Sequence, residues 1–134
     1  MSDTMPLISV VDDDRSVCRA VGQLLQAAGY PVETFASAGE FLGSPALTRT
    51  ACLVLDIHLN GVSGFDLQQR LTADRSGIPI IFITAHDDVP TRKMARRAGV
   101  VAYLPKPFDG RDLLAAIRGA IGGDTRRPVM PSPL

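Results

Sequence analysis

The sequence predicts an α/β protein built on a doubly wound, five-stranded parallel sheet with helices on both faces. Five short apolar segments alternate with segments of helical periodicity, which is typical of parallel strands joined by helices. Three of the apolar segments, LISVV, CLVL and IPIIFI, contain almost no polar residue. Strands of this kind are covered on both faces, as in a sheet between two layers of helices.

The order of the elements follows from these apolar segments. Strands are expected at residues 7–11, 32–35, 52–55, 78–83 and 101–104. A strand that connects through a helix to a parallel neighbour does so with a right-handed crossover in nearly all known cases. All five strands are therefore expected in one sheet.

Helical periodicity is clearest directly after the first strand. One face of that segment carries Val17, Val21, Leu24, Leu25 and Ala28. This is the spacing of an amphipathic helix. Gly29 ends the pattern, because glycine readily adopts the left-handed conformation that closes many helices. Asp14 precedes the helix and is expected to accept hydrogen bonds from its free amides.

Two further helices are predicted in the second half of the chain. The last has an apolar stripe formed by Leu113, Leu114, Ile117, Ala120 and Ile121. Between Val89 and Ala98 the stripe is thin, and a basic set surrounds it: Arg92, Lys93, Arg96 and Arg97. Such a set is most often a solvated helix face. The alternative is a partner surface that pairs with acids of a second copy or an effector.

Composition excludes several classes of protein. With 134 residues, 46% of them hydrophobic and 21% charged, the chain has the size and composition of one globular domain. Its 14 basic and 14 acidic residues balance, which argues against direct nucleic-acid binding. A membrane span needs about 20 apolar residues, and every apolar segment of this chain is shorter. The acidic start does not resemble a secretory signal. Cys18 and Cys52 are expected to be reduced, so a cytoplasmic location is predicted.

The domain is expected to cover residues 5–121. The remaining segment, 122–134, contains three prolines and two arginines without periodicity. This composition predicts a flexible tail or the start of a linker.

Polar residues gather at the carboxyl ends of the predicted strands. Asp12 and Asp13 follow the first strand, Asp56 the third, Thr84 the fourth and Lys106 the fifth. In a parallel sheet these ends meet at one edge, and ligands bind there at the point where the strand order reverses. In the doubly wound order 2-1-3-4-5, that point lies between the first and third strands, which carry the acids.

Three carboxylates at one point repel each other unless a proton or a cation compensates. Oxygen ligands with room for water favour Mg²⁺, and Lys106 supplies a second positive charge. Taken singly, the acids fit a helix N-terminus, Thr84 fits a strand end and Lys106 fits a solvated surface. Together they suit a site that receives a phosphoryl group, where positioning and charge neutralisation provide most of the catalysis.

These motifs resemble those of response-regulator receiver domains of two-component systems over residues 5–121. The matching motifs are VVDDD, LVLDIHLNGVSG, IFITAH and YLPKPF. Asp56 lies 43 residues after Asp13, 28 before Thr84 and 50 before Lys106, as in that family. The resemblance implies the flavodoxin- or CheY-like fold with strand order 2-1-3-4-5. The segment AHDDVPTRKMARRAG is further similar to FixJ-type receivers that precede LuxR-like DNA-binding domains.

The resemblance implies a role for each acid. Asp56 would be the phosphoacceptor that takes the group from a phosphohistidine of a sensor histidine kinase. Asp13 and Asp56 would bind Mg²⁺ directly, and Asp12 would act through a coordinated water. The backbone carbonyl of His58 would be a further metal ligand.

The resemblance also implies a switch. Thr84 and Lys106 would contact the phosphoryl oxygens, and Tyr103 would turn inward as Thr84 moves toward the phosphate. The Lys106–Pro107 peptide would be cis. The surface of the fourth helix, fifth strand and fifth helix would then change its partner, which would be a second copy or an effector that regulates transcription. The domain would phosphorylate itself and lose the group slowly, without being a turnover enzyme.

One position departs from the family pattern. Many members have proline four residues after the acceptor, where this chain has Asn60 followed by Gly61. Asn-Gly favours a turn with positive φ, so the loop is expected to reach its shape by other means. His58 and His86 are either solvated loop residues or, by the sharper hypothesis, groups that face the phosphoryl site and control the access of water.

Two other classes of function share some of these features. A Mg²⁺-dependent phosphohydrolase with an aspartyl nucleophile usually has an acid/base Asp two residues after the nucleophile, where this chain has His58. A flavodoxin-like cofactor carrier needs a Ser-, Thr- and Gly-rich phosphate loop after the first strand. DDDRSV stands there instead, and its acids would repel phosphate.

Overall fold

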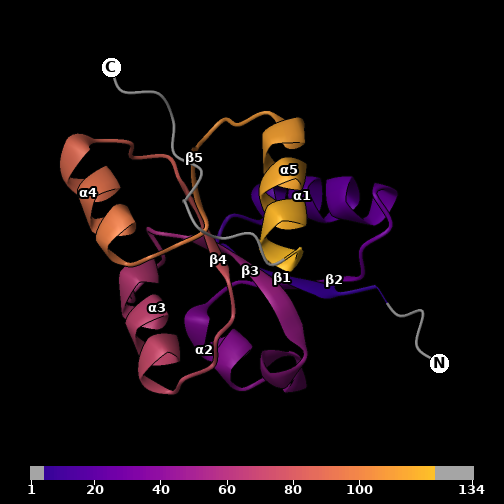
Figure 1. Ribbon diagram of the computed structural model, residues 1–134, viewed down its shortest axis with the longest axis horizontal. Helices are drawn as coiled ribbons and strands as arrows, with labels where there is room; N and C mark the ends of the chain where they lie inside the picture. Colours follow the sequence, from indigo (N-terminus) through magenta and orange to yellow (C-terminus); the bar gives the residue numbers. More distant parts are fainter. Residues whose placement is uncertain (1–4, 123–134) are drawn as a thin grey trace.

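A parallel sheet with strand order β2-β1-β3-β4-β5 lies at the centre of the computed structural model, which describes residues 5–122 (Figure 1). The strands are β1 (Leu7–Val11), β2 (Val32–Phe35), β3 (Thr50–Asp56), β4 (Ile80–Thr84) and β5 (Ala102–Pro105). The helices are α1 (Arg15–Ala27), α2 (Ala38–Leu42), α3 (Gly64–Ala73), α4 (Val89–Arg97), α5 (Gly110–Ile121) and the short 3-10 helix η1 (Pro45–Thr48). The predicted fold class and strand order are confirmed.

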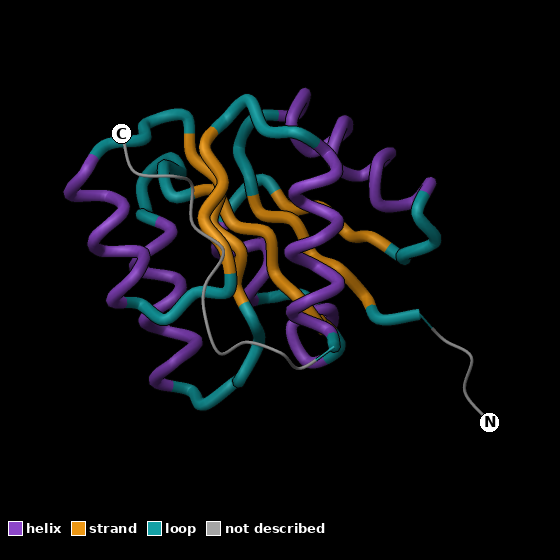
Figure 2. The backbone as a smooth tube through the Cα atoms, turned by 45° about the horizontal axis from the view of Figure 1, so that its top comes forward, coloured by secondary structure: helices purple, strands orange, loops and turns teal. Residues whose placement is uncertain are grey.

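Helices cover both faces of the sheet (Figure 2). Alternate residues of β3 point to opposite faces: Val54 belongs to the core beneath α1 and α5, whereas Leu53 and Leu55 belong to the core beneath α2, α3 and α4. Because both faces are covered, β1 and β4 are buried along their whole length, as their continuous apolar sequence predicts.

Two strands begin two residues away from their predicted starts, and every other strand boundary lies within one residue of its prediction. β3 begins at Thr50 instead of residue 52, because the Thr50 hydroxyl is satisfied inside the protein by Ser9 Oγ at 2.7 Å and by the Ala46 carbonyl at 2.6 Å. A polar residue can therefore extend a buried strand. β4 begins at Ile80 instead of residue 78, since Pro79 has no N–H to donate to the sheet.

Helix caps fix the loops that lead away from the carboxyl edge of the sheet. Asp14 accepts from the amides of Ser16 and Val17 at the start of α1, as predicted. Asp88 accepts from the amide of Thr91 at the start of α4. Side-chain oxygens at these positions satisfy amides that have no partner within the helix.

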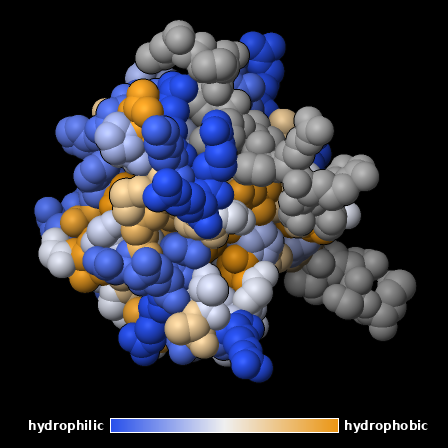
Figure 3. Space-filling model, turned by 60° about the vertical axis from the view of Figure 1, so that its left-hand side comes forward, coloured by the Kyte–Doolittle hydropathy of each residue, from blue (hydrophilic) through white to orange (hydrophobic). Residues whose placement is uncertain are grey.

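The face that carries α3 and α4 is mostly hydrophilic and is interrupted by small hydrophobic patches (Figure 3). Val89 and Met94 of α4 are 60% and 49% exposed. Within residues 5–122, no helix is long and apolar enough to cross a membrane.

Candidate functional site

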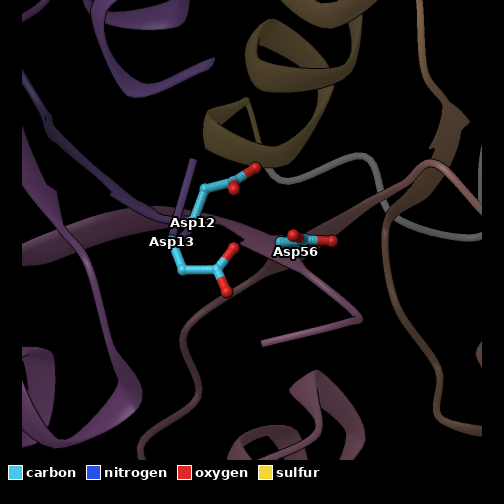
Figure 4. A group of neighbouring side chains, drawn as sticks. All are labelled: Asp12, Asp13 and Asp56. Carbon is cyan, nitrogen blue, oxygen red and sulfur yellow. The ribbon is translucent and has the colours of Figure 1, made fainter. Parts of the chain in front are cut away.

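The three predicted acids meet at the carboxyl edge of the sheet. Asp12 follows the last residue of β1 and Asp56 is the last residue of β3, two neighbouring parallel strands. Carboxylate oxygens of Asp12, Asp13 and Asp56 lie within 4.8 Å of one another, and Figure 4 shows the three side chains converging. Asp12 and Asp56 are only 1% and 5% exposed, so two of these acids are held away from water.

Lys106 reaches the same point from the segment after β5. Its Nζ lies 2.8 Å from Asp12 Oδ2 and 3.5 Å from Asp56 Oδ2. Burial acts to lower the pKa of Lys106, but the hydrogen bond to Asp12 and the charge of Asp56 raise it above its ordinary value. The lysine is therefore a fixed cation. The Lys106–Pro107 peptide is cis, as the resemblance implied.

The pKa of Asp56 is raised to about 6. Burial is the main cause and the charge of Asp12 is the second, while the amide of His58 and the ammonium of Lys106 act in the opposite direction. One lysine therefore does not neutralise the acids fully. A further cation among them would favour the ionised form of Asp56.

Thr84, at the end of β4, is held by two histidines. Its Oγ1 lies 3.2 Å from His58 Nδ1 and accepts from the His86 amide at 2.9 Å. The two imidazole rings stand edge to face with centroids 4.6 Å apart. Burial and the neighbouring His86 lower the pKa of His58. His58 thus lies beside Asp56, to which its amide donates, and His86 contacts Thr84 and the His58 ring.

The loop from β3 to α3 is shaped without the proline of the family pattern. The Asn60 amide donates to Asp13 Oδ2 at 3.2 Å, and Gly61 has φ +83°, as the Asn-Gly pair predicts. Gly64 lies so close to the end of β3 that a Cβ there would be 2.5 Å from the carbonyl oxygen of Asp56. The acidic site and this loop are therefore packed directly against each other.

Tyr103 is fully buried in β5, and its hydroxyl donates to Asp87 Oδ1 at 3.0 Å. Asp87 also accepts from Nε and from Nη2 of Arg92, both at 2.6 Å. Sequence analysis singled out Tyr103 and Arg92 but missed Asp87, because an acid before a helix N-cap has no distinctive pattern. Only the side-by-side placement of β4 and β5 brings the three together.

The residues present fit a hard divalent cation. Three carboxylates from two adjacent segments offer only oxygen ligands, the type that Mg²⁺ prefers. Among residues 5–122, every buried side-chain polar atom has a hydrogen-bond partner. Asp13 is the least buried of the three, which leaves that side open to solvent.

Fold and site together define the receiver class of signalling domains. The chain belongs to the response regulator receiver domain family, whose model matches residues 8–118. Receiver domains of two-component systems are signalling modules and not turnover enzymes. Phosphorylation and Mg²⁺ binding are typical of the family, and a sensor kinase and an effector are implied as partners.

Known relatives support this assignment. The chain is 40% identical over 121 residues to the response regulator protein TodT of Pseudomonas putida strain F1, covering 90% of this chain and 53% of TodT. Among solved structures, the response regulator StyR is 46% identical with a TM-score of 0.81, covering 89% of this chain and 60% of that one. FixJ-N is 32% identical with a TM-score of 0.80, covering 92% and 97%. The chain thus spans about half the length of TodT, and the similarity to FixJ confirms the predicted subfamily.

Proposed function

We propose that this chain is a phosphoacceptor that takes a phosphoryl group onto Asp56 from a sensor histidine kinase. One observation carries the proposal: Asp56 lies within 4.8 Å of the carboxylate oxygens of Asp12 and Asp13 and is paired with Lys106. A nucleophilic carboxylate with a fixed ammonium on one side and acids on the other is suited to phosphoryl transfer.

In the transfer step, a carboxylate oxygen of Asp56 forms a bond to phosphorus. The N–P bond of the phosphohistidine breaks, and its electron pair returns to the imidazole, which takes up a proton. Lys106 neutralises the charge on the phosphoryl oxygens, and Thr84 donates its hydroxyl to one of them. The same groups hold the acyl phosphate until water hydrolyses it slowly.

Asp13, Asp56 and the backbone carbonyl of His58 would hold Mg²⁺, with Asp12 acting through a water. The ion would neutralise the phosphoryl oxygens and keep Asp56 ionised during attack. Asp12 is suited to an indirect role because Lys106 already occupies one of its oxygens at 2.8 Å, and its other oxygen accepts from the Asp14 amide.

The output would leave through the α4-β5-α5 surface. Phosphorylation moves Thr84 and changes the position of α4, and a second copy or an effector then binds. The exposed basic residues of α4 and the apolar Val89 and Met94 suit such a contact. Because the match covers only 53% of TodT, we propose a cytoplasmic regulator of transcription in which residues 5–121 are the receiver. Most of the predicted linker 122–134 lies outside the described residues.

The direct test is incubation of the 134-residue chain with acetyl phosphate and Mg²⁺, followed by intact-mass measurement. We expect one added phosphoryl group, no addition with excess EDTA and none with Asp56→Asn. Asp14→Asn is the matched control, since Asn caps a helix as well as Asp does and Asp14 caps α1 outside the cluster. Equal labelling of wild type and Asp56→Asn would disprove the assignment.

A further inference from the structure

Asn60 is the only asparagine in the sequence, and glycine follows it. In this dipeptide the glycine nitrogen attacks the preceding side-chain amide more readily than in others, because glycine has no Cβ to hinder the approach. The products are aspartate and isoaspartate, and both carry a negative charge that the amide lacks. The rate in a folded protein therefore depends on how firmly the structure holds the two residues.

The structure leaves both reacting groups free to move together. Asn60 and Gly61 are exposed in the loop between β3 and α3. Among residues 5–122, no group forms a hydrogen bond with the Asn60 carboxamide, and the Gly61 N–H donates to none. A Cβ placed on Gly61 would meet no atom within 4 Å. The carboxamide can therefore rotate toward the Gly61 nitrogen without breaking a contact.

The flanks of this loop, in contrast, are fixed. The Gly64 amide donates to the Ile57 carbonyl at 2.7 Å, and His58 pairs with Ser63 in an isolated antiparallel bridge. The loop is thus closed by backbone contacts a few residues on either side of Asn60. A change in backbone length at Asn60 must therefore be absorbed within the loop itself.

One backbone contact connects the loop to the acids. The Asn60 amide donates to Asp13 Oδ2 at 3.2 Å, and Asp13 converges with Asp12 and Asp56 (Figure 4). A carboxylate formed at position 60 would lie beside this group and would attract a cation. A longer backbone at the same position would move the amide donor away from Asp13. The two products are therefore expected to affect the acids differently.

We propose that Asn60 is a site of spontaneous covalent modification, at which asparagine converts to aspartate and isoaspartate beside the three acids. The Gly61 nitrogen forms a bond to Cγ of Asn60 and loses its proton to water, while the side-chain nitrogen takes up a proton and leaves as ammonia. The attack is intramolecular, so it needs no enzyme. Water then opens the cyclic imide at either carbonyl. One opening gives aspartate with the normal backbone, and the other gives isoaspartate, in which Cβ becomes an additional backbone atom.

The first measurement follows the full chain in warm, mildly alkaline buffer by intact mass, peptide mapping and labelling with an isoaspartate methyltransferase. Wild type should gain the mass difference between an amide and an acid, with isoaspartate in the peptide that contains Asn60. Asn60→Gln should not, because glutamine must close a larger ring. Folded and guanidinium-unfolded wild type should react at rates within about tenfold of each other. If only the unfolded chain reacts, the fold protects Asn60 and the proposal is disproved.

The pair Asp109–Gly110 provides a matched control within the chain. Aspartate followed by glycine forms the same imide, with loss of water in place of ammonia. The Asp109 carboxylate caps α5 and accepts from the amide and from the guanidinium of Arg111, both at 2.9 Å. In Asn60→Asp the same dipeptide occurs at both places, and isoaspartate should form about tenfold faster at position 60. Equal rates would show that the loop gives no special freedom, and would overturn the proposal.

The effect on the acids rests on the proposed function, because it concerns Mg²⁺. Anion exchange separates the aged forms, and calorimetry measures their affinity for Mg²⁺. The isoaspartate form should bind about tenfold more weakly than fresh wild type, since Asp13 loses its amide donor. Asn60→Asp, which adds only the charge, should bind at least as tightly as wild type. Equal affinity of the isoaspartate form would overturn the effect on the acids. Failure of fresh wild type to bind Mg²⁺ would overturn the proposed function instead, since the mass measurement does not depend on the ion.

Discussion

The interior of the sheet and its carboxyl edge are formed by the same strands, but the interior buries apolar side chains and the edge buries polar ones. In β3, Leu53, Val54 and Leu55 are fully buried and apolar, and the next residue is the buried acid Asp56. In β4, Ile83 is followed by the buried Thr84. One step along a strand thus separates residues whose burial stabilises the fold from residues whose burial costs free energy.

The free-energy cost of burying polar groups is reflected in the pKa of an acid at the carboxyl edge. The pKa of Asp56 is raised to about 6, chiefly by burial and by the nearby Asp12, so the protein disfavours the ionised form that phosphoryl transfer requires. Lys106 offsets part of the cost through its contacts with Asp12 and Asp56. The comparison shows that burial of the apolar interior stabilises the fold. Burial of the acids at the carboxyl edge offsets part of that stabilisation and holds a reactive site.

The largest effect is expected in the interior. Phe82 is 0% exposed and packs edge to face against Phe65 with ring centroids 4.9 Å apart. Phe82→Ala should lower the free energy of unfolding by about 3–5 kcal/mol, as measured by urea denaturation without Mg²⁺. Val62→Ala, at a position 42% exposed, should change it by less than about 0.5 kcal/mol. Equal losses in the two variants would show that the interior is not the main source of stability.

The sequence predicts the interior of this protein better than its polar contacts. Continuous apolar segments identify the central strands because any residue of such a segment must be buried on both faces. Thr50 lies outside the predicted strand because its burial depends on Ser9 and Ala46, partners that are distant in sequence and adjacent only after folding.

The same limit applies at the site. Asp12, Asp13, Asp56 and Lys106 could be placed together because parallel strand ends must meet at one edge. The partners of Tyr103 could not, since its hydroxyl reaches Asp87 only through the loop that leads to α4. Topology is encoded in the apolar pattern, whereas individual hydrogen bonds depend on loop conformations that the pattern leaves open.

A smaller effect is expected where the interior meets the edge. A Cβ on Gly64 would lie 2.5 Å from the carbonyl oxygen of Asp56 and 2.8 Å from Ile57 Cα, and backbone atoms cannot move aside as a flexible side chain can. Gly64→Ala should therefore cost about 1–3 kcal/mol in urea denaturation. It should also weaken Mg²⁺ binding, because the displaced backbone carries Asp56.

The control for this substitution is Gly119→Ala in α5. A Cβ at Gly119 meets no atom within 4 Å, and alanine favours a helix over glycine by about 0.5–1 kcal/mol. The two changes add the same methyl group and should have opposite signs. A stable Gly64→Ala protein with normal Mg²⁺ affinity would show that the edge is not rigidly coupled to the sheet.

The smallest effect should be a gain in stability. The folded-state pKa of Asp56 is about 6 against an ordinary value of 3.8, so the folded protein binds more protons between these values. Its stability therefore falls as the pH rises through this interval, and the penalty is complete above about pH 6. Asp56→Asn carries no charge and should be about 1–2 kcal/mol more stable than wild type at neutral pH in EDTA.

Two further measurements separate this effect from a general gain on removing an acid. The advantage of Asp56→Asn should shrink as the pH falls below the raised pKa of Asp56, and the exposed Asp112→Asn should show no comparable gain. Mg²⁺ should reverse the ranking, because an ion that binds only the folded wild type stabilises it by mass action. If Asp56→Asn were less stable than wild type in EDTA at neutral pH, Lys106 alone would neutralise the acids at the carboxyl edge. Burial of the Asp56 carboxylate would then cost no free energy.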